Sequence, residues 1–253
     1  MGNFYETKRA LSEYLLFHYG SAKEILPHGG PADALFYPVR CISECLDIGQ
    51  LPVRARGLDL GCATGRSTFE MARHCAEVIG IDFSHQFIRA AERLRSEGKL
   101  DYTYIEEGEI TRGATAFTPQ GMDRERVRFE QGDAQHLRPM GLFDLVLMAN
   151  LIDRLPRPKV FLQHIHEIIR PGGQLILSSP YTWLAEYTPR EEWLGGFEEQ
   201  GKTVHTFDSI RSILQENFQM RLRKNLPFLI REHARKYQWS VAEATVWIRN
   251  ENA

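Results

Sequence analysis

The sequence predicts an α/β domain in which a mostly parallel sheet carries helices on both faces. Short apolar segments typical of buried strands alternate with helical patterns along the 253-residue chain, an order characteristic of parallel sheets. Hydrophobic residues make up 43% and charged residues 25%, as in globular proteins with a sizeable core. No internal repeat or low-complexity tract is present, so we interpret residues 1–253 as a single domain.

The chain is expected to begin with a helical cap over residues 1–55. Two predicted helices, 5–17 and 33–48, flank the Gly- and Pro-rich loop "HYGSAKEILPHGGP". The alternating core occupies 56–253. Its predicted strands are 55–61, 77–84, 126–133, 143–150 and 174–179, and its predicted helices are 66–75, 85–98 and 158–173.

Three segments of the core have patterns beyond the simple alternation of strands and helices. Region 100–126 alternates polar and apolar residues and is expected to form an inserted strand or hairpin. Segments 218–233 and 243–250 are expected to form two long strands joined by a turn. The helix at 158–173 should end at Pro171-Gly172-Gly173. The residues expected on its apolar face are Val160, Phe161, Ile165, Ile168 and Ile169.

The stretch "LDLGCATGRS" predicts a nucleotide-binding turn between a strand and a helix. A dinucleotide fingerprint would require glycines at positions 61, 63 and 66, where the chain has Gly61, Ala63 and Arg66. The D-x-G-x-G-x-G pattern of S-adenosylmethionine-dependent methyltransferases finds Asp59, Gly61, Ala63 and Gly65, with only the middle glycine replaced. The turn therefore favours a class I methyltransferase, with a Rossmann-like, mostly parallel seven-stranded sheet.

Two carboxylates at later strand ends extend the predicted cofactor site. Asp82 ends a strand about 20 residues after the turn, where a carboxylate accepts hydrogen bonds from ribose hydroxyls. Asp133 ends the next parallel strand and could accept a hydrogen bond from the adenine amino group. We include the adjacent Cys62, Phe83 and Ala134 in the predicted cofactor-binding set.

Six segments together resemble a known family. They are "YLLFHYG", "DLGCATGRSTFEMAR", "VIGIDFSHQFI", "QGDAQHL", "SSPYTWLAEYTPREEWLGG" and "PFLIREHARKYQW". Over about Tyr5 to Arg249 the chain resembles the methyltransferase of ovothiol biosynthesis, 4-mercaptohistidine (5-thiohistidine) N1-methyltransferase, in its free-standing form. The resemblance implies S-adenosylmethionine as cofactor and N-methylation of the imidazole ring of 5-thiohistidine, the last step to ovothiol A. It also implies that a sulfoxide synthase and a lyase act upstream as separate proteins.

The aromatic segment at about 180–200 is the predicted substrate cap. It follows a strand end on the side of the sheet where open α/β sheets bind ligands. Tyr181, Trp183, Tyr187 and Trp193 could stack on a flat heteroaromatic substrate and exclude water from it. The alternative is that the tryptophans pin this segment to the core.

The predicted catalytic residues lie at the end of the strand at 143–150 and just after it. A thioimidazole can carry a proton on each nitrogen, so a base would assist methyl transfer. Asp153 is the candidate base, although it could equally pair with Arg154 or Arg157, and Asn150 is expected to contact the ligands directly.

An amino-acid substrate also requires partners for its charged groups. Arg40 and Arg231 are the leading partners for a carboxylate, because guanidinium groups bind carboxylates in a fork. Arg40 together with Tyr19 suits the methionyl carboxylate of the cofactor, which leaves Arg231 for the substrate. Glu232 could receive the ammonium group and His233 the thiolate.

Composition and motifs exclude several other classes. A net charge of −2 gives no field that would attract nucleic acid or an anionic membrane, and the motif typical of base N-methylation is missing after 143–149. No signal peptide or long apolar run is present, and the cysteines form no C-x-x-C pair, so we expect a cytoplasmic protein without a metal site. Two rivals stay open: a methyltransferase of another small molecule, such as histidine or a carboxylate, and a non-catalytic cofactor-binding scaffold.

Overall fold

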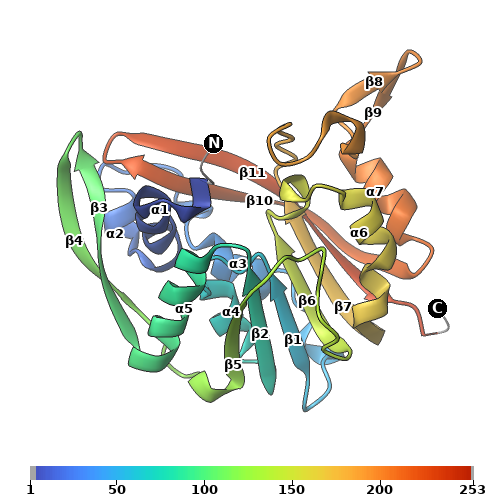
Figure 1. Ribbon diagram of the computed structural model, residues 1–253, viewed down its shortest axis with the longest axis horizontal. Helices are drawn as coiled ribbons and strands as arrows, with labels where there is room; N and C mark the ends of the chain where they lie inside the picture. The colour runs from blue at the N-terminus through green and yellow to red at the C-terminus, as the bar shows by residue number, and fades with distance from the viewer. Residues whose placement is uncertain (1–3, 252–253) are drawn as a thin grey trace.

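The computed structural model describes residues 4–251 and is built on a seven-stranded sheet (Figure 1). The strand order is β10-β11-β7-β6-β1-β2-β5, and β11 runs antiparallel to both of its neighbours. The mostly parallel sheet predicted from the sequence is confirmed. The strands are β1 (Arg56–Leu60), β2 (Glu77–Asp82), β5 (Val127–Gln131), β6 (Phe143–Ala149), β7 (Ile169–Ser179), β10 (Phe218–His233) and β11 (Lys236–Arg249).

Helices cover both faces of this sheet. On β6, Leu145 and Leu147 point to one face while Val146 and Met148 point to the other, and the two sets belong to separate buried clusters. The first face packs against α1 (Lys8–Tyr19), α3 (Tyr37–Ser43), α4 (Arg66–Met71) and α5 (His85–Glu97). The second packs against α6 (Pro158–His164) and α7 (Thr206–Leu214).

The N-terminal helices differ from the predicted boundaries. Helix α1 begins later than expected, at the N-cap Thr7, whose hydroxyl accepts a hydrogen bond from Ala10 N–H. A short helix, α2 (Ala22–Ile25), occupies the predicted loop, where Ser21 and Glu24 form a capping box. The predicted helix 33–48 is reduced to α3, because Phe36 adopts a left-handed conformation (φ 56°) that a continuous helix cannot contain. Short 3₁₀ turns at Ala32–Ala34 and Ile48–Gln50 flank it.

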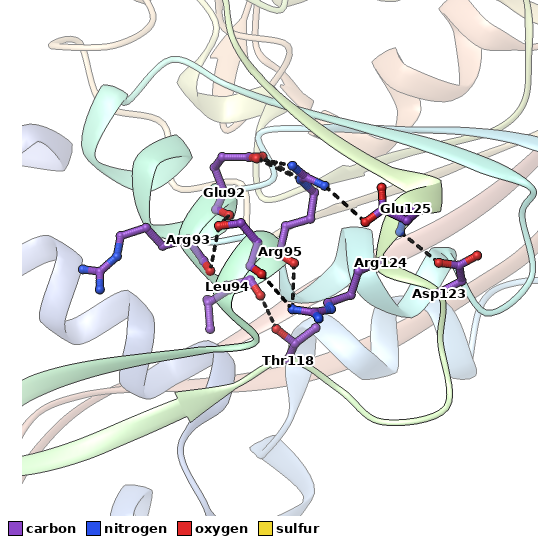
Figure 2. Close-up of polar contacts among 9 residues, drawn as sticks. Glu92, Arg93, Leu94, Arg95, Thr118, Asp123, Arg124 and Glu125 are labelled. Carbon is purple, nitrogen blue, oxygen red and sulfur yellow. Dashed lines mark hydrogen bonds and ion pairs between the residues drawn. The ribbon is translucent and has the colours of Figure 1, made fainter.

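Within region 100–126, β3 (Lys99–Glu107) and β4 (Ile110–Phe117) pair as a separate two-stranded sheet. Figure 2 shows how its base is tied to the end of α5. The Thr118 hydroxyl donates to Leu94 O, and the Arg124 guanidinium donates to Arg95 O at 3.0 Å. The Thr118 hydroxyl shares Leu94 O with the N–H of Gly98, whereas the Arg124 guanidinium pairs a carbonyl of the last turn and places a cation at the helix C-terminus.

The predicted helix 158–173 is too long. Helix α6 ends at His164, a 3₁₀ turn spans Ile165–Ile168, and β7 begins at Ile169. Pro171-Gly172-Gly173 lies within β7 as a bulge, because the pairing with β6 jumps from Phe143↔Ile169 to Leu145↔Gln174. Val160 is 43% exposed, so it does not share the buried face with Ile165, which is 2% exposed.

The C-terminal half holds elements that the sequence pattern did not predict. Helix α7 and the small hairpin of β8 (Phe197–Glu199) and β9 (Lys202–Val204) follow the aromatic segment. Strand β11 begins at Lys236 rather than at 243, which makes the β10–β11 hairpin long. Its far end packs on α1, on the 3₁₀ turn Ala32–Ala34 and on β3 (Figure 1).

Candidate active site

A cleft of about 820 Å³ opens at the carboxyl ends of β1, β2, β5 and β6. This is where open α/β sheets bind ligands, and the volume is within the range of small-molecule sites. The cleft is also lined by α1, by the segment before it, and by residues 186 and 187. Nine of the predicted site residues belong to this lining: Gly61, Cys62, Ala63, Asp82, Phe83, Asp133, Ala134, Asn150 and Tyr187.

The turn between β1 and α4 depends on left-handed backbone conformations. Gly61 and Gly65 have φ of 74° and 85°, which glycine adopts without strain. At Gly65 a Cβ atom would also come within 2.5 Å of the Phe129 ring, so no larger residue fits. Ala63, at the position of the missing glycine, has φ of 46° and carries the strain of a left-handed alanine.

Asp82 holds this turn and faces the cleft. Its Oδ2 accepts a hydrogen bond from Ala63 N–H at 2.9 Å, and its Oδ1 accepts one from Ser84 N–H at 2.8 Å. Removal of the carboxylate from bulk water raises the pKa of Asp82 to about 6. Each carboxylate oxygen has a second lone pair, so Asp82 can still accept hydrogen bonds from two ligand hydroxyls. The free acceptor positions on the two carboxylate oxygens fit the two hydroxyl groups of a ribose.

Asp133 lies across the same end of the cleft. Its Oδ1 accepts from Gln135 N–H at 2.9 Å, and its Oδ2 pairs with His136 Nδ1 at 2.8 Å. The side chain is 41% exposed, so it is accessible to a ligand amino group. Phe83, which also lines the cleft, is 61% exposed.

Three other predicted cofactor residues support the turn without lining the cleft. Asp59 is buried, and its Oδ2 accepts hydrogen bonds from the Ser67 and Thr68 hydroxyls, both at 2.7 Å. Burial raises the pKa of Asp59 to about 6. The Tyr19 hydroxyl donates to Thr64 O at 2.7 Å, and Gly65 forms the N-cap of α4. These residues shape the site from behind.

The structure does not bring Arg40, Arg231 or His233 to the cleft. Arg40 pairs with Glu44 one turn along α3. Arg231 is 3% exposed and pairs with Glu106 of β3 at 2.7 Å. Strand β10 carries residues 231–233 beyond the sheet toward the inserted hairpin, so the predicted roles in carboxylate and thiolate binding lack the required proximity.

Asn150 and Asp153, which both follow β6, lie in different surroundings. Asn150, in a left-handed conformation (φ 53°), lines the cleft and accepts a hydrogen bond from the Tyr37 hydroxyl at 2.8 Å. Asp153 is completely buried outside the lining, where its Oδ2 accepts from Thr182 N–H at 2.9 Å and pairs with Arg154 at 3.1 Å. Burial raises the pKa of Asp153. Its position suits a link between two loops rather than a base in contact with ligand.

The aromatic segment divides between core and cleft. Trp183 is 8% exposed, stacks on Trp193 with ring centroids 6.2 Å apart, and donates from Nε1 to Thr206 Oγ1. Trp193 donates to Thr188 O, and the Tyr181 hydroxyl donates to Glu243 of β11. These three residues lie outside the cleft lining, so the structure gives no support to the expectation that they roof the substrate. Of the four aromatic residues predicted for the cap, Tyr187 lines the cleft, next to Glu186.

Residues that the sequence pattern did not identify complete the other end of the cleft. The Tyr5 ring lies 6.0 Å from Tyr14 and 6.1 Å from both Phe87 and Tyr187. The Arg154 guanidinium lies 5.0 Å from the centroid of the Tyr187 ring. Tyr14 and Phe87 fall within segments that carry the family resemblance. Only their proximity in the fold distinguishes them from ordinary core aromatic residues.

His18 is a further cleft residue on α1. It accepts a hydrogen bond from Arg66 N–H through Nδ1, and burial lowers its pKa to about 3. The imidazole is therefore neutral, with its proton on Nε2.

Neither a metal site nor a membrane span is found over residues 4–251. No group of three or more potential metal-ligating side chains occurs among these residues. None of the helices described there is long and apolar enough to cross a membrane. The four cysteines are free and buried.

Comparisons with known proteins relate the chain to methyltransferases. Two family models, each described as a methyltransferase domain, match residues 58–175 and 118–245, and the second covers just over half of the chain. The ubiquinone biosynthesis O-methyltransferase of Cronobacter sakazakii is 25% identical over 150 residues, which is 57% of this chain and 52% of that protein. The corresponding enzyme of Coxiella burnetii is 27% identical over 122 residues. The matched region thus spans about half the length of these relatives.

Similar solved structures support the fold. The N-methyltransferase NodS from Bradyrhizobium japonicum, in complex with S-adenosylhomocysteine, superposes with a TM-score of 0.54 at 16% identity and covers 96% of this chain and 98% of its own. An S-adenosylmethionine-dependent methyltransferase from Methanosarcina mazei gives a TM-score of 0.53 at 19% identity, covering 80% of this chain and 95% of its own.

Proposed function

The chain belongs to the methyltransferase-domain family, and we propose that it methylates an imidazole nitrogen of 5-thiohistidine, the last step of ovothiol A biosynthesis. The observation that carries this proposal is a single cleft with unlike ends. Asp82 and the glycine turn line one part of the cleft, and Tyr5, Tyr14 and Tyr187 line another. The two parts meet where the Ser84 hydroxyl donates to Tyr5 O at 3.0 Å. Such a cleft suits a nucleoside cofactor beside a flat heteroaromatic acceptor.

S-adenosylmethionine is the cofactor, and it supplies a methyl group activated on a sulfonium. We assign the ribose hydroxyls to Asp82 and the adenine amino group to Asp133. Phe83 would pack against the adenine ring at the mouth of the cleft. Asp59 and Tyr19 hold the turn in the shape that this arrangement needs.

In the proposed reaction, an imidazole nitrogen uses its lone pair to form the new N–C bond while the S–C bond breaks and its electrons remain on sulfur. The attacking nitrogen carries no proton, and the methylated ring, which has gained a positive charge, releases the proton held on its other nitrogen or on the thiol to solvent. The protein contributes orientation and exclusion of water. Tyr5, Tyr14 and Tyr187 would hold the ring of the acceptor, and Asn150, fixed by Tyr37, would separate the two ends. We do not assign Asp153 as base, since it does not line the cleft.

The pathway setting follows from the same resemblance. A sulfoxide synthase and a lyase, as separate proteins, would supply the thiohistidine. The cytoplasm is the proposed compartment, with which four free cysteines are consistent.

The test is an acceptor comparison with methyl-labelled S-adenosylmethionine. We expect label in 5-thiohistidine and much less in histidine, and none when Asp82→Asn protein is used at low cofactor concentration. The O-methyltransferase relatives suggest a phenolic acceptor as the second candidate, so a catechol is included. Label in histidine alone or in the catechol alone would contradict the proposal.

A further inference from the structure

The charges that line the cleft are unevenly distributed. Among the described lining residues, Arg154 is the only lysine or arginine. The carboxylates Asp82 and Asp133 lie at the cofactor end, whereas Arg154 contacts Tyr5 and Tyr187 at the acceptor end. The Arg154 guanidinium, paired with the buried Asp153, lies beside the rings where the acceptor would bind.

Arg154 is held in one orientation by contacts with four residues. Its Nη1 donates to Asp153 O and Thr182 O, both at 2.9 Å, and lies 3.1 Å from Asp153 Oδ2. Its Nε donates to the Tyr5 hydroxyl at 3.2 Å. The face of the guanidinium lies over the Tyr187 ring. Nη2 takes part in none of these bonds, and the side chain is 23% exposed.

This arrangement is that of a preorganised binding group. The bonds to Asp153 and Thr182 hold the guanidinium from its buried side, and the stacking on Tyr187 fixes its plane. A guanidinium fixed in this way can meet a carboxylate with little loss of side-chain entropy. The attraction is stronger in a cleft of low dielectric constant than in water.

We propose that Arg154 binds the carboxylate of the methyl acceptor, so that the substrate class is a small flat heteroaromatic carboxylate. This inference rests on the proposed methyl transfer and assigns to Arg154 the role that the sequence pattern gave to Arg231. Glu186, which is exposed and lines the same end, offers a partner for an ammonium group on the same acceptor. An α-amino acid with an aromatic ring carries both charges.

The first experiment measures binding alone, by calorimetry, with protein saturated with S-adenosylhomocysteine. The probes are urocanate, a flat imidazole carboxylate, and its neutral amide. We expect wild-type protein to bind urocanate about tenfold or more tightly than the amide, and Arg154→Gln to remove this difference. Arg157→Gln is the matched control, because Arg157 is an exposed arginine of the same loop outside the cleft lining. It should preserve the difference.

Equal binding of the two probes by wild-type protein, including no binding of either, overturns the inference. So does a preference for urocanate that survives in Arg154→Gln. Melting temperature and affinity for S-adenosylhomocysteine, measured on each variant, separate a lost carboxylate partner from a disturbed fold.

The second experiment uses turnover and separates this inference from the proposed function. Two acceptors are compared, 5-thiohistidine and its decarboxylated amine. Arg154→Gln should lower kcat/KM for 5-thiohistidine about 10- to 100-fold and that for the amine less than threefold. A wild type that methylates neither acceptor refutes thiohistidine as substrate, while the urocanate experiment still decides the role of Arg154. Equal losses on both acceptors contradict a carboxylate contact.

Discussion

The two ends of the cleft are built in different ways. The cofactor end comes from a short stretch of chain, the turn at 61–65, together with Asp82 on the neighbouring strand. The acceptor end is assembled from residues far apart in sequence, in which Tyr5 meets Tyr187 and Arg154. Backbone conformation and a carboxylate define the first end, whereas packing between distant segments defines the second. The two ends meet where the Ser84 hydroxyl donates to Tyr5 O and where Phe87 packs with Ala63. Changes at Tyr187 and Arg154, away from these contacts, should therefore spare the cofactor end.

The largest effect is expected outside both ends, at Trp183. Cutting this core tryptophan to alanine should cost about 3–5 kcal/mol of stability, because it removes the stack on Trp193, the hydrogen bond to Thr206 and burial in the second core cluster. Thermal unfolding measures the loss. Trp239→Ala is the matched control, since Trp239 is 55% exposed and should change stability by less than about 0.5 kcal/mol.

If the Trp183→Ala protein kept its melting temperature but lost turnover, Trp183 would have a role in substrate binding instead of a role in the core. The sequence alone supported either position. The decisive partner, Thr206, lies on α7, a helix that the pattern did not predict. Without that helix, nothing in the sequence indicated a buried surface for Trp183.

Asp82→Asn should give the next largest effect. It replaces a charged acceptor that also holds Ala63 N–H, and should weaken S-adenosylmethionine binding by about 1.5–3 kcal/mol. Calorimetry is the measurement. If the affinity of the variant matched that of wild type, Asp82 would not contact the ribose.

The pKa of Asp82, about 6, adds a pH dependence with a defined sign. The carboxylate is the better acceptor, so cofactor affinity should fall as pH drops below about 6, by up to tenfold per pH unit. Stability changes in the opposite direction. A folded pKa above the unfolded value of about 3.9 contributes stability below that value, and this contribution is lost as pH rises through about 6. Asp82→Asn should flatten the binding profile, and an unchanged profile would assign the titration to another group.

The smallest effect is expected at Ala63, the departure from the methyltransferase glycine pattern. Ala63→Gly relieves the left-handed strain but removes a methyl group packed near Ala10 and Phe87. Cofactor affinity should stay within about threefold, or ~0.6 kcal/mol. Gly65→Ala is the opposed control, because its Cβ would meet the Phe129 ring and binding should collapse. If Ala63→Gly instead lost its affinity for the cofactor, the placement of this turn against the cofactor would be wrong.

These contrasts explain what the sequence could and could not predict. The turn and Asp82 follow from local chain chemistry and strand order, so the sequence predicted that they would lie together, as they do in the structure. Arg231 had suitable chemistry, but the length of the β10–β11 hairpin carries it to Glu106. The helix at 158–173 was extended too far because Pro171-Gly172-Gly173 resembles a helix stop, whereas here it forms a bulge in β7. In both cases tertiary pairing overrode a local signal.

The most direct test of the two-ended cleft is a paired measurement on Tyr187→Leu. The leucine keeps apolar bulk but removes the ring that faces Tyr5 and supports Arg154. We predict that KM for the methyl acceptor rises about tenfold, while the Kd for S-adenosylhomocysteine changes by less than about twofold. Parallel loss of both affinities, or loss of cofactor affinity alone, would contradict the separation of the two ends.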